Sequence, residues 1–223
     1  MDNLVKLNAQ TALLMSVLYP IIAVIAGLLG RILFGRIGTP QGNANINDVV
    51  GVGMYGTILT SFVLVLISIY VFKDSRSDIY FERRIFALSR LYYLFPLAWA
   101  GVALIALFNV DFTAYSAEIM LRVIIATLAI GINEELVTRG ILLVGLRNSR
   151  FAEWQAWLIT LVVFSLYHLI NVIGGGSPLI VVIVATGGAL LYVSRRVFNN
   201  LFVPIGLHAF YDTAFYLLTG KYM

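Results

Sequence analysis

The sequence predicts an all-α integral membrane protein, a polytopic helical bundle of about seven transmembrane helices, and three observations predict this class. Apolar residues make up 61% of the 223-residue chain and charged residues only 12%, a composition that soluble domains rarely have. Seven stretches reach the roughly 20 apolar residues that cross a bilayer core. These stretches are apolar on all sides, without the alternation over about ten residues that marks membrane β-strands.

The seven predicted spans follow one another along the whole chain. They cover about 11–34, 49–72, 91–110, a stretch that starts near 114 and runs into GINEELVTRG (131–140), 153–173, 178–194 and 201–219. We find no internal repeat, low-complexity tract or linker, so we expect a single membrane domain over 1–223. Its N-terminal spans and an amphipathic segment occupy 1–112, and the core that carries the motifs described below occupies 113–219. The segment SDIYFERRIFALSRLYYLF (77–95) fits either a basic flank of a span or an amphipathic helix on the inner leaflet.

Charge and cysteine content exclude several classes of function. The chain contains no cysteine, so it has no disulfide framework, thiolate nucleophile or cysteine-ligated metal. The net charge is +4, but the basic residues are scattered between apolar runs, so we expect no nucleic-acid partner. With a cytoplasmic N-terminus, eleven Lys and Arg residues fall in inner segments and three in outer segments. This bias predicts a multi-pass protein of the cell membrane with its N-terminus inside and its C-terminus outside.

Inside the apolar spans, ionisable residues gather in three short motifs. The motifs are EELVTR with Glu134, Glu135 and Arg139, FSLYH with Phe164 and His168, and HAFYD with His208 and Asp212. Residues four apart share a helix face, so each motif aligns its two outer members and Glu135 can pair with Arg139. Glu134 is turned by about 100° from Glu135 and can point elsewhere.

A simple estimate of depth suggests that these motifs meet. If the fourth helix runs to about Gly145 and the fifth starts near Glu153, Glu134 and His168 lie roughly 17 and 23 Å from the loop between them. His208 falls near the middle of the seventh span. Ionisable groups at such depth cost several kcal/mol unless paired or hydrated, so we expect them to face an internal cavity. A polar network that only locks the helices together is the competing interpretation.

The residue types in this cluster fit hydrolysis of an amide bond. A carboxylate and an imidazole on one water molecule act as a general base, and a second imidazole with a hydrogen-bonding partner can stabilise an oxyanion. We expect no cofactor. The alternative is a zinc ion held by Glu134, His168 and His208 with an open position for water, although the sequence contains no HExxH motif.

The three motifs, in this order on successive hydrophobic segments, resemble the CPBP family of type II CAAX prenyl endopeptidases and Abi-type, bacteriocin-processing membrane proteins. EELVTR fits EExxxR, FSLYH fits FxxxH and HAFYD fits HxxxN/D. The resemblance covers about residues 113–219 and marks the chain as similar to bacterial members. It implies an intramembrane glutamate-type protease.

The resemblance also implies a role for each motif residue. Glu134 would activate the water with help from His168, and His208 and Asp212 would form the oxyanion site. Glu135 and Arg139 would support the site by pairing, and Phe164 would pack beside it. The prenyl-protease members usually have Asn at the position of Asp212, and an ionised carboxylate there would repel an oxyanion. Asp212 would therefore act in its protonated form or by orienting His208 as an imidazolium.

The expected substrate is a hydrophobic or lipid-anchored peptide, or a membrane protein, that enters from the surrounding membrane lipids. Two other classes of function stay open at this point. A non-catalytic membrane scaffold or bacteriocin-immunity protein would act by binding a membrane protein partner. A proton-coupled transporter would use similar buried residues, but the chain lacks an inverted repeat and paired broken helices.

Overall fold

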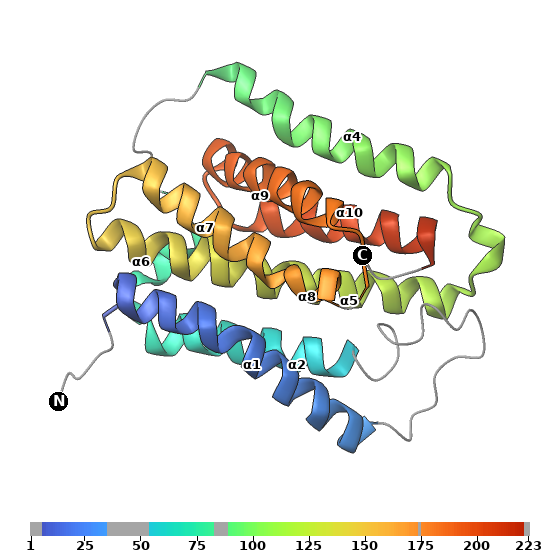
Figure 1. Ribbon diagram of the computed structural model, residues 1–223, viewed down its shortest axis with the longest axis horizontal. Helices are drawn as coiled ribbons and strands as arrows, with labels where there is room; N and C mark the ends of the chain where they lie inside the picture. The colour runs from blue at the N-terminus through green and yellow to red at the C-terminus, as the bar shows by residue number, and fades with distance from the viewer. Residues whose placement is uncertain (1–5, 35–53, 83–88, 174, 221–223) are drawn as a thin grey trace.

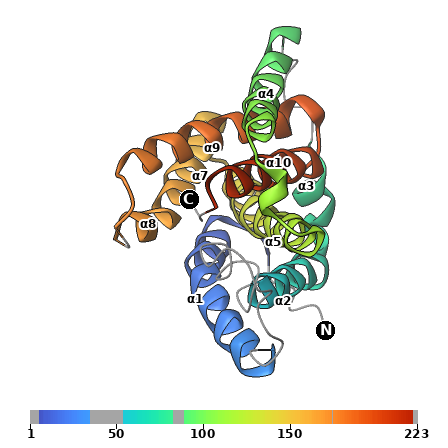
Figure 2. The same ribbon diagram turned by 90° about the vertical axis from the view of Figure 1, so that its right-hand side faces the viewer.

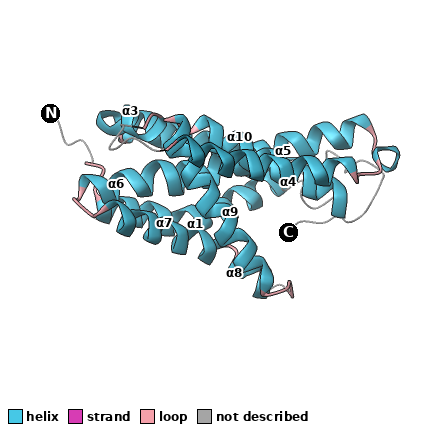
Figure 3. Cartoon of the chain, turned by 90° about the horizontal axis from the view of Figure 1, so that it is seen from above, coloured by secondary structure: helices cyan, strands magenta, loops and turns pink. Residues whose placement is uncertain are grey.

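The computed structural model describes residues 6–34, 54–82, 89–173 and 175–220. Within these residues the chain is helical and contains no β-strand (Figure 3), apart from one isolated bridge between Phe81 and Asn200. Residues 49–53 of the second predicted span and residues 83–88 of the predicted amphipathic segment lie outside the described residues. The prediction of an all-α polytopic helical bundle is confirmed.

Ten α-helices are joined by short 3₁₀ and π-helical turns in the described part of the chain. They are α1 (Ala9–Phe34), α2 (Met54–Leu66), α3 (Arg76–Tyr80), α4 (Leu94–Phe108), α5 (Ala117–Glu135), α6 (Leu143–Asn148), α7 (Glu153–Tyr167), α8 (Leu169–Ile173), α9 (Leu179–Phe198) and α10 (Phe202–Thr219). One π-helix, η2 (Ile67–Val71), extends α2, and another, η6 (Leu136–Leu142), joins α5 to α6. The helical path that begins at Ala117 therefore continues to Asn148.

The long helices run roughly along one common direction, and α5 and α10 form the centre of the bundle (Figures 1 and 2). Helix α5 packs against α10 on one side and α2 on the other, and α1 packs on α2. Helix α10 also contacts α4 and α9, and α7 packs against α9. In both views α9 and α10 lie between α4 and the remaining helices.

Among the described residues, five helical segments are long and apolar enough to cross a membrane. They are Ala9–Gly30, Met54–Val71, Arg90–Phe108, Glu153–Ile173 and Leu179–Phe198. Their outward faces carry many large apolar side chains, such as Val24, Phe62 and Phe108, as expected where lipid replaces water. The protein is thus a membrane protein. A total of seven crossings and the direction of the N-terminus stay predictions.

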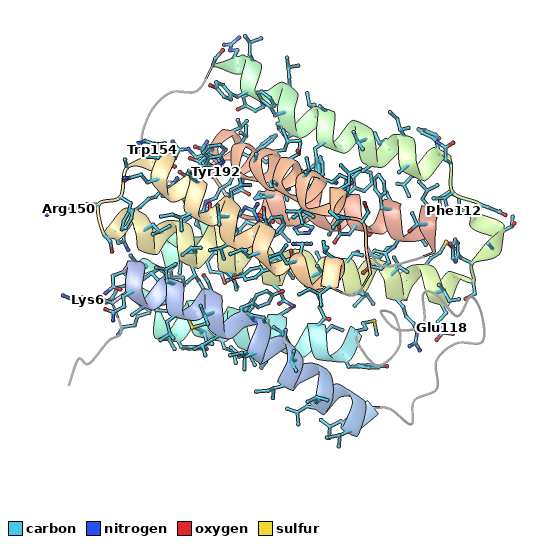
Figure 4. All side chains as sticks on the ribbon, in the orientation of Figure 1. Lys6, Phe112, Glu118, Arg150, Trp154 and Tyr192 are labelled. Carbon is cyan, nitrogen blue, oxygen red and sulfur yellow. The ribbon has the colours of Figure 1, made fainter. Side chains whose placement is uncertain are left out.

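Charged residues gather at one end of the bundle, which we call the basic end. Figure 4 shows Lys6 and Arg150 at this end, and Phe112 and Glu118 at the opposite end. The basic end holds a buried ion-pair network around Glu82, a residue of which only 8% is exposed. Glu82 accepts hydrogen bonds from Arg147 at 3.0 Å, from Arg195 at 2.9 Å and from Arg196. Burial alone would raise the pKa of Glu82. The positive charges of the adjacent arginines, of which Arg147 has the largest effect, outweigh burial, so the pKa lies below its ordinary value.

Arg195 links this network to the middle of the bundle. Its guanidinium is fully buried and donates to the backbone carbonyls of Asp78, at 2.7 Å, and of Arg139. The carbonyl of Arg139 belongs to the π-helix η6, where the usual i to i−4 pairing is interrupted. The segment after α3, the end of α9 and η6 are therefore tied together by one side chain.

Candidate active site

The central helix α5 presents two adjacent glutamates just before its geometry changes. The helix begins at Ser116, whose hydroxyl accepts a hydrogen bond from the backbone of Ile119 at 3.2 Å. It ends with Glu134 and Glu135, after which the wider turns of η6 begin. Thr138 in η6 donates its hydroxyl to the carbonyl of Glu134 at 2.5 Å. Such π-helical turns occur frequently at functional sites.

Glu134 lies between the two histidines of the protein. Its Oε2 atom is 3.8 Å from Nε2 of His168 and 3.9 Å from Nε2 of His208. Both distances are too long for a direct hydrogen bond, and both are within the reach of a bridging water molecule. Among the described residues, this oxygen finds no hydrogen-bond partner. The three side chains come from three separate helices and meet inside the bundle.

His168 follows the last residue of α7 and is held by that helix. Its Nδ1 atom is 3.0 Å from the carbonyl oxygen of Phe164, one turn earlier. A carbonyl only accepts, so we assign the ring hydrogen to Nδ1. In the neutral ring, Nε2 then carries a lone pair and faces Glu134. The phenyl ring of Phe164 also packs on the imidazole, with ring centroids 5.0 Å apart. Phe164 therefore holds His168 through both its backbone carbonyl and its side chain.

His208 on α10 is surrounded by carboxylates. Its Nδ1 atom donates to Glu135 at 2.9 Å, and its Nε2 atom is 3.5 Å from Oδ2 of Asp212, one turn later. Since Nδ1 carries the hydrogen bonded to Glu135, Nε2 can donate toward the cavity only when the ring is an imidazolium. Asp212 lies close enough to orient such a ring.

A buried ion pair holds Glu135 in place below the cavity. Arg139 donates to Glu135 at 3.0 Å and, through its other terminal nitrogen, to the backbone carbonyl of Gly188 on α9 at 2.8 Å. Its guanidinium also stacks 4.0 Å above the ring of Phe164. Both Glu135 and Arg139 are almost completely buried. Oε1 of Glu135 accepts from both Arg139 and His208, whereas its Oε2 is buried without a partner among the described residues. Arg139 therefore connects α5, α7 and α9.

These residues surround one cavity. Glu134, His168, His208 and Asp212 line it together with apolar side chains of α9, such as Ile183. About 60 Å³ is open to the centres of water molecules, and since one water needs about 10–15 Å³ by this measure, several fit. The lining residues of α9 lie mostly in its first half, and those of α10 run from His208 to Tyr216. The cavity therefore extends from the middle of the bundle toward the end opposite the basic end.

The side chains do not fit a metal ion in their present arrangement. In the described parts of the chain, no group of three His, Cys, Asp or Glu residues has the spacing of a ligand set. We derive no step through a metal.

Three residues of this site were not among those predicted from the sequence. Gly187 and Gly188 let two side chains approach α9, because a Cβ atom at Gly187 would lie 2.8 Å from the ring of Trp99 and one at Gly188 would lie 2.8 Å from Arg139. Trp99 of α4 lines the cavity. The pair of glycines within an apolar span was the available signal, since such a pair marks a close approach. Nothing in the sequence distinguished Trp99 from a lipid-facing tryptophan.

The fold and the site define a class, namely polytopic helical membrane proteins with a carboxylate and two imidazoles around an internal cavity. Residues 116–214 match the family model described as type II CAAX prenyl endopeptidase Rce1-like. The match runs from the start of α5 into α10 and contains all seven predicted site residues, so the resemblance of this part of the chain to the Rce1-like family is confirmed. No curated protein and no solved structure gave a significant match. The family supports, in general terms, an intramembrane endopeptidase of the CAAX type.

Proposed function

We propose that the protein is an intramembrane endopeptidase of the glutamate type, which hydrolyses a peptide bond in a hydrophobic or lipid-anchored peptide or membrane protein. The observation that carries the proposal is the position of Glu134 between His168 and His208, at distances that one water molecule can bridge. The match of residues 116–214 to the model of an endopeptidase family supports it. The apolar lining of the cavity favours a substrate that comes from the bilayer.

In the proposed reaction, a water molecule donates one hydrogen toward Glu134 and the other toward Nε2 of His168. Glu134 takes a proton as the water oxygen bonds to the carbonyl carbon of the substrate. The carbonyl oxygen becomes an oxyanion that the imidazolium of His208 stabilises, with Asp212 orienting that ring. The carbon–nitrogen bond then breaks, and Glu134 returns its proton to the leaving amine. The products are a carboxylic acid and an amine, which become a carboxylate and an ammonium group when the acid proton passes to the amine, so atoms and charge balance.

Glu135, Arg139 and Phe164 have supporting roles in this proposal. Glu135 fixes the ring of His208 through Nδ1 and so directs Nε2 to the cavity. Arg139 compensates the charge of Glu135, and Phe164 supports both Arg139 and His168. Glu135 and Arg139 do not line the cavity, whereas Phe164 forms part of its wall.

The test compares membrane peptides from cells that express the wild-type chain or Glu134→Gln, by mass spectrometry. We expect fragments that depend on Glu134, and a loss of their formation rate by roughly 10²–10⁴-fold in the variant, as is typical when a general base is removed. His168→Ala and His208→Ala should lose the same fragments. Glu118→Gln is the matched control, because Glu118 lies on the same helix but is paired with Arg122 at its exposed end. Identical fragments in all strains would contradict hydrolysis and favour the non-catalytic scaffold or immunity protein.

A further inference from the structure

Trp99 lines the cavity and carries an unpaired hydrogen-bond donor. The residue is only 9% exposed, and its Nε1 atom is buried without a partner among the described residues. Buried donors are nearly always paired in proteins, so an unpaired donor requires an explanation. We propose that the indole N–H of Trp99 binds a backbone carbonyl of the substrate, in the peptide group next to the scissile bond. This inference rests on the proposed function.

The position of the indole is fixed from two sides. Its ring stacks on Tyr211 of α10 with centroids 4.0 Å apart and an angle of 14° between the planes. Its outer edge sits against Gly187 of α9, where a side chain would collide with it. A donor held in this way loses little freedom when it forms a hydrogen bond, which favours binding.

Trp99 and the hydrolytic residues reach the cavity from different sides. Trp99 comes from α4, whereas Glu134 and His168 come from α5 and α7. Helices α9 and α10 lie between these two sides of the bundle (Figure 2). In an extended peptide, successive groups of the chain point to opposite faces. When one carbonyl faces Glu134 and His208, the neighbouring carbonyl therefore faces Trp99, which makes Trp99 a residue that positions the substrate.

The other two tryptophans provide matched controls. The chain contains three tryptophans, and neither Trp154 nor Trp157 lines the cavity. Trp154 is 63% exposed near the basic end, and Trp157 contacts the ring of Tyr192. A chain with Trp154→Phe and Trp157→Phe keeps Trp99 as its single tryptophan, so its fluorescence reports on the cavity wall.

The kinetic test uses the full chain in phosphatidylcholine vesicles and an internally quenched peptide with an Ala-Val-Leu-Ile-Val core. Trp99→Phe keeps an aromatic ring but removes the donor, so we expect KM to rise roughly three- to tenfold, as for one neutral hydrogen bond, with kcat within about twofold. Trp154→Phe should change neither constant. A thioamide on either side of the scissile bond, tested one at a time, weakens the acceptor. It should raise KM in the wild type at one of these positions and add nothing in Trp99→Phe.

Two results would overturn the role of Trp99, namely an unchanged KM in Trp99→Phe or the same thioamide effect in both proteins. If Trp99→Phe lowers the melting temperature, a second replacement shows whether the loss of the N–H group or the loss of stability raises KM. Benzothienylalanine, incorporated in place of the single tryptophan of the double variant, retains the ring shape without the N–H and should raise KM by the same factor.

A binding measurement separates this inference from the proposed hydrolysis. In Glu134→Gln combined with Trp154→Phe and Trp157→Phe, the unquenched peptide should cause a saturable change in Trp99 emission, and vesicles without peptide should not. Absence of cleavage by the wild type, with this emission change present, would contradict the hydrolytic function alone. Absence of the emission change would overturn the role of Trp99.

Discussion

Among single residues, Gly188 has the most demanding surroundings. Its carbonyl accepts a hydrogen bond from Arg139, and the space where a side chain would begin is taken by Arg139, Leu161 and Phe164, at 2.8, 3.0 and 3.0 Å. These atoms belong to side chains of η6 and α7 that pack against α9. A methyl group at this position would push the guanidinium of Arg139 away from the carbonyl oxygen of Gly188, its hydrogen-bond acceptor.

We therefore expect Gly188→Ala to destabilise the protein by about 1–3 kcal/mol, as overpacking of a core does. It should also reduce hydrolysis, because a displaced Arg139 no longer holds Glu135 and His208. The measurements are the melting temperature in detergent and the cleavage rate. Gly101→Ala on α4 is the control, since its new methyl group meets open space and alanine favours a helix. Equal melting temperatures for the two variants would contradict the packing argument.

The residue scale also shows how far the sequence could predict the site. Pairs four apart on one helix, Glu135 with Arg139 and Phe164 with His168, were predictable from helix geometry alone, and the structure brings both pairs together. The second partner of Arg139 is the carbonyl of Gly188, 49 positions away. A backbone carbonyl carries no sequence signal, so this contact depends on tertiary packing that periodicity does not encode. The structure brings Glu134, His168 and His208 together as predicted, while their catalytic roles stay a proposal.

At the scale of elements, the stretch from α3 to Glu82 differs most from its sequence interpretation. From the sequence, 77–95 was a basic flank or an amphipathic surface helix, but the described part of it contains the buried Glu82. The structure pairs Glu82 with Arg147, Arg195 and Arg196 from α6 and α9. Contacts between residues more than 60 positions apart in the sequence cannot be predicted from a local charge pattern.

This network predicts a dependence of stability on pH. The pKa of Glu82 in the folded protein lies below its ordinary value of 4.5, so folding favours the ionised carboxylate. Its stabilising contribution is complete above the unfolded pKa and is lost as the pH falls through the lowered folded pKa. We expect the melting temperature in detergent to fall steeply below about pH 4.5 in the wild type.

Glu82→Gln tests the origin of that slope. The variant should melt at a lower temperature at neutral pH, because three arginines lose their shared carboxylate. Between pH 5 and 3 it should show a flatter curve than the wild type. Glu118→Gln, which changes an exposed ion pair at the opposite end, should leave the curve unchanged. Parallel curves for the wild type and Glu82→Gln would exclude Glu82 as the titrating group.

For the whole molecule, the distribution of charge and the position of the cavity have a joint consequence. The cavity extends away from the basic end, and the positive-inside rule predicts that the basic end lies in the cytoplasm. With this orientation, the substrate would reach Glu134 from the outer half of the membrane. The all-α bundle itself was predictable, because apolar runs of span length leave the chain few other structures in lipid.

The orientation can be measured because the natural chain has no cysteine. We expect Phe112→Cys, at the end opposite the basic end, to react with a membrane-impermeant maleimide in intact cells. Lys6→Cys, at the basic end, should react only after the membrane is permeabilised. The reverse labelling pattern would place the cavity in the cytoplasmic half and would overturn the predicted topology.

The wide turn of η6 fixes how α5 and α6, the two halves of one long helical path, are rotated relative to each other about the helix axis. Residues after it are anchored by Arg147 and residues before it carry Glu134. Deleting one residue of η6, such as Val137, would rotate these halves against each other by about 100°. Hydropathy and the number of spans would hardly change, yet the glutamate would leave the cavity. Length changes compatible with hydrolysis should therefore fall in the loops between helices and spare this one stretch.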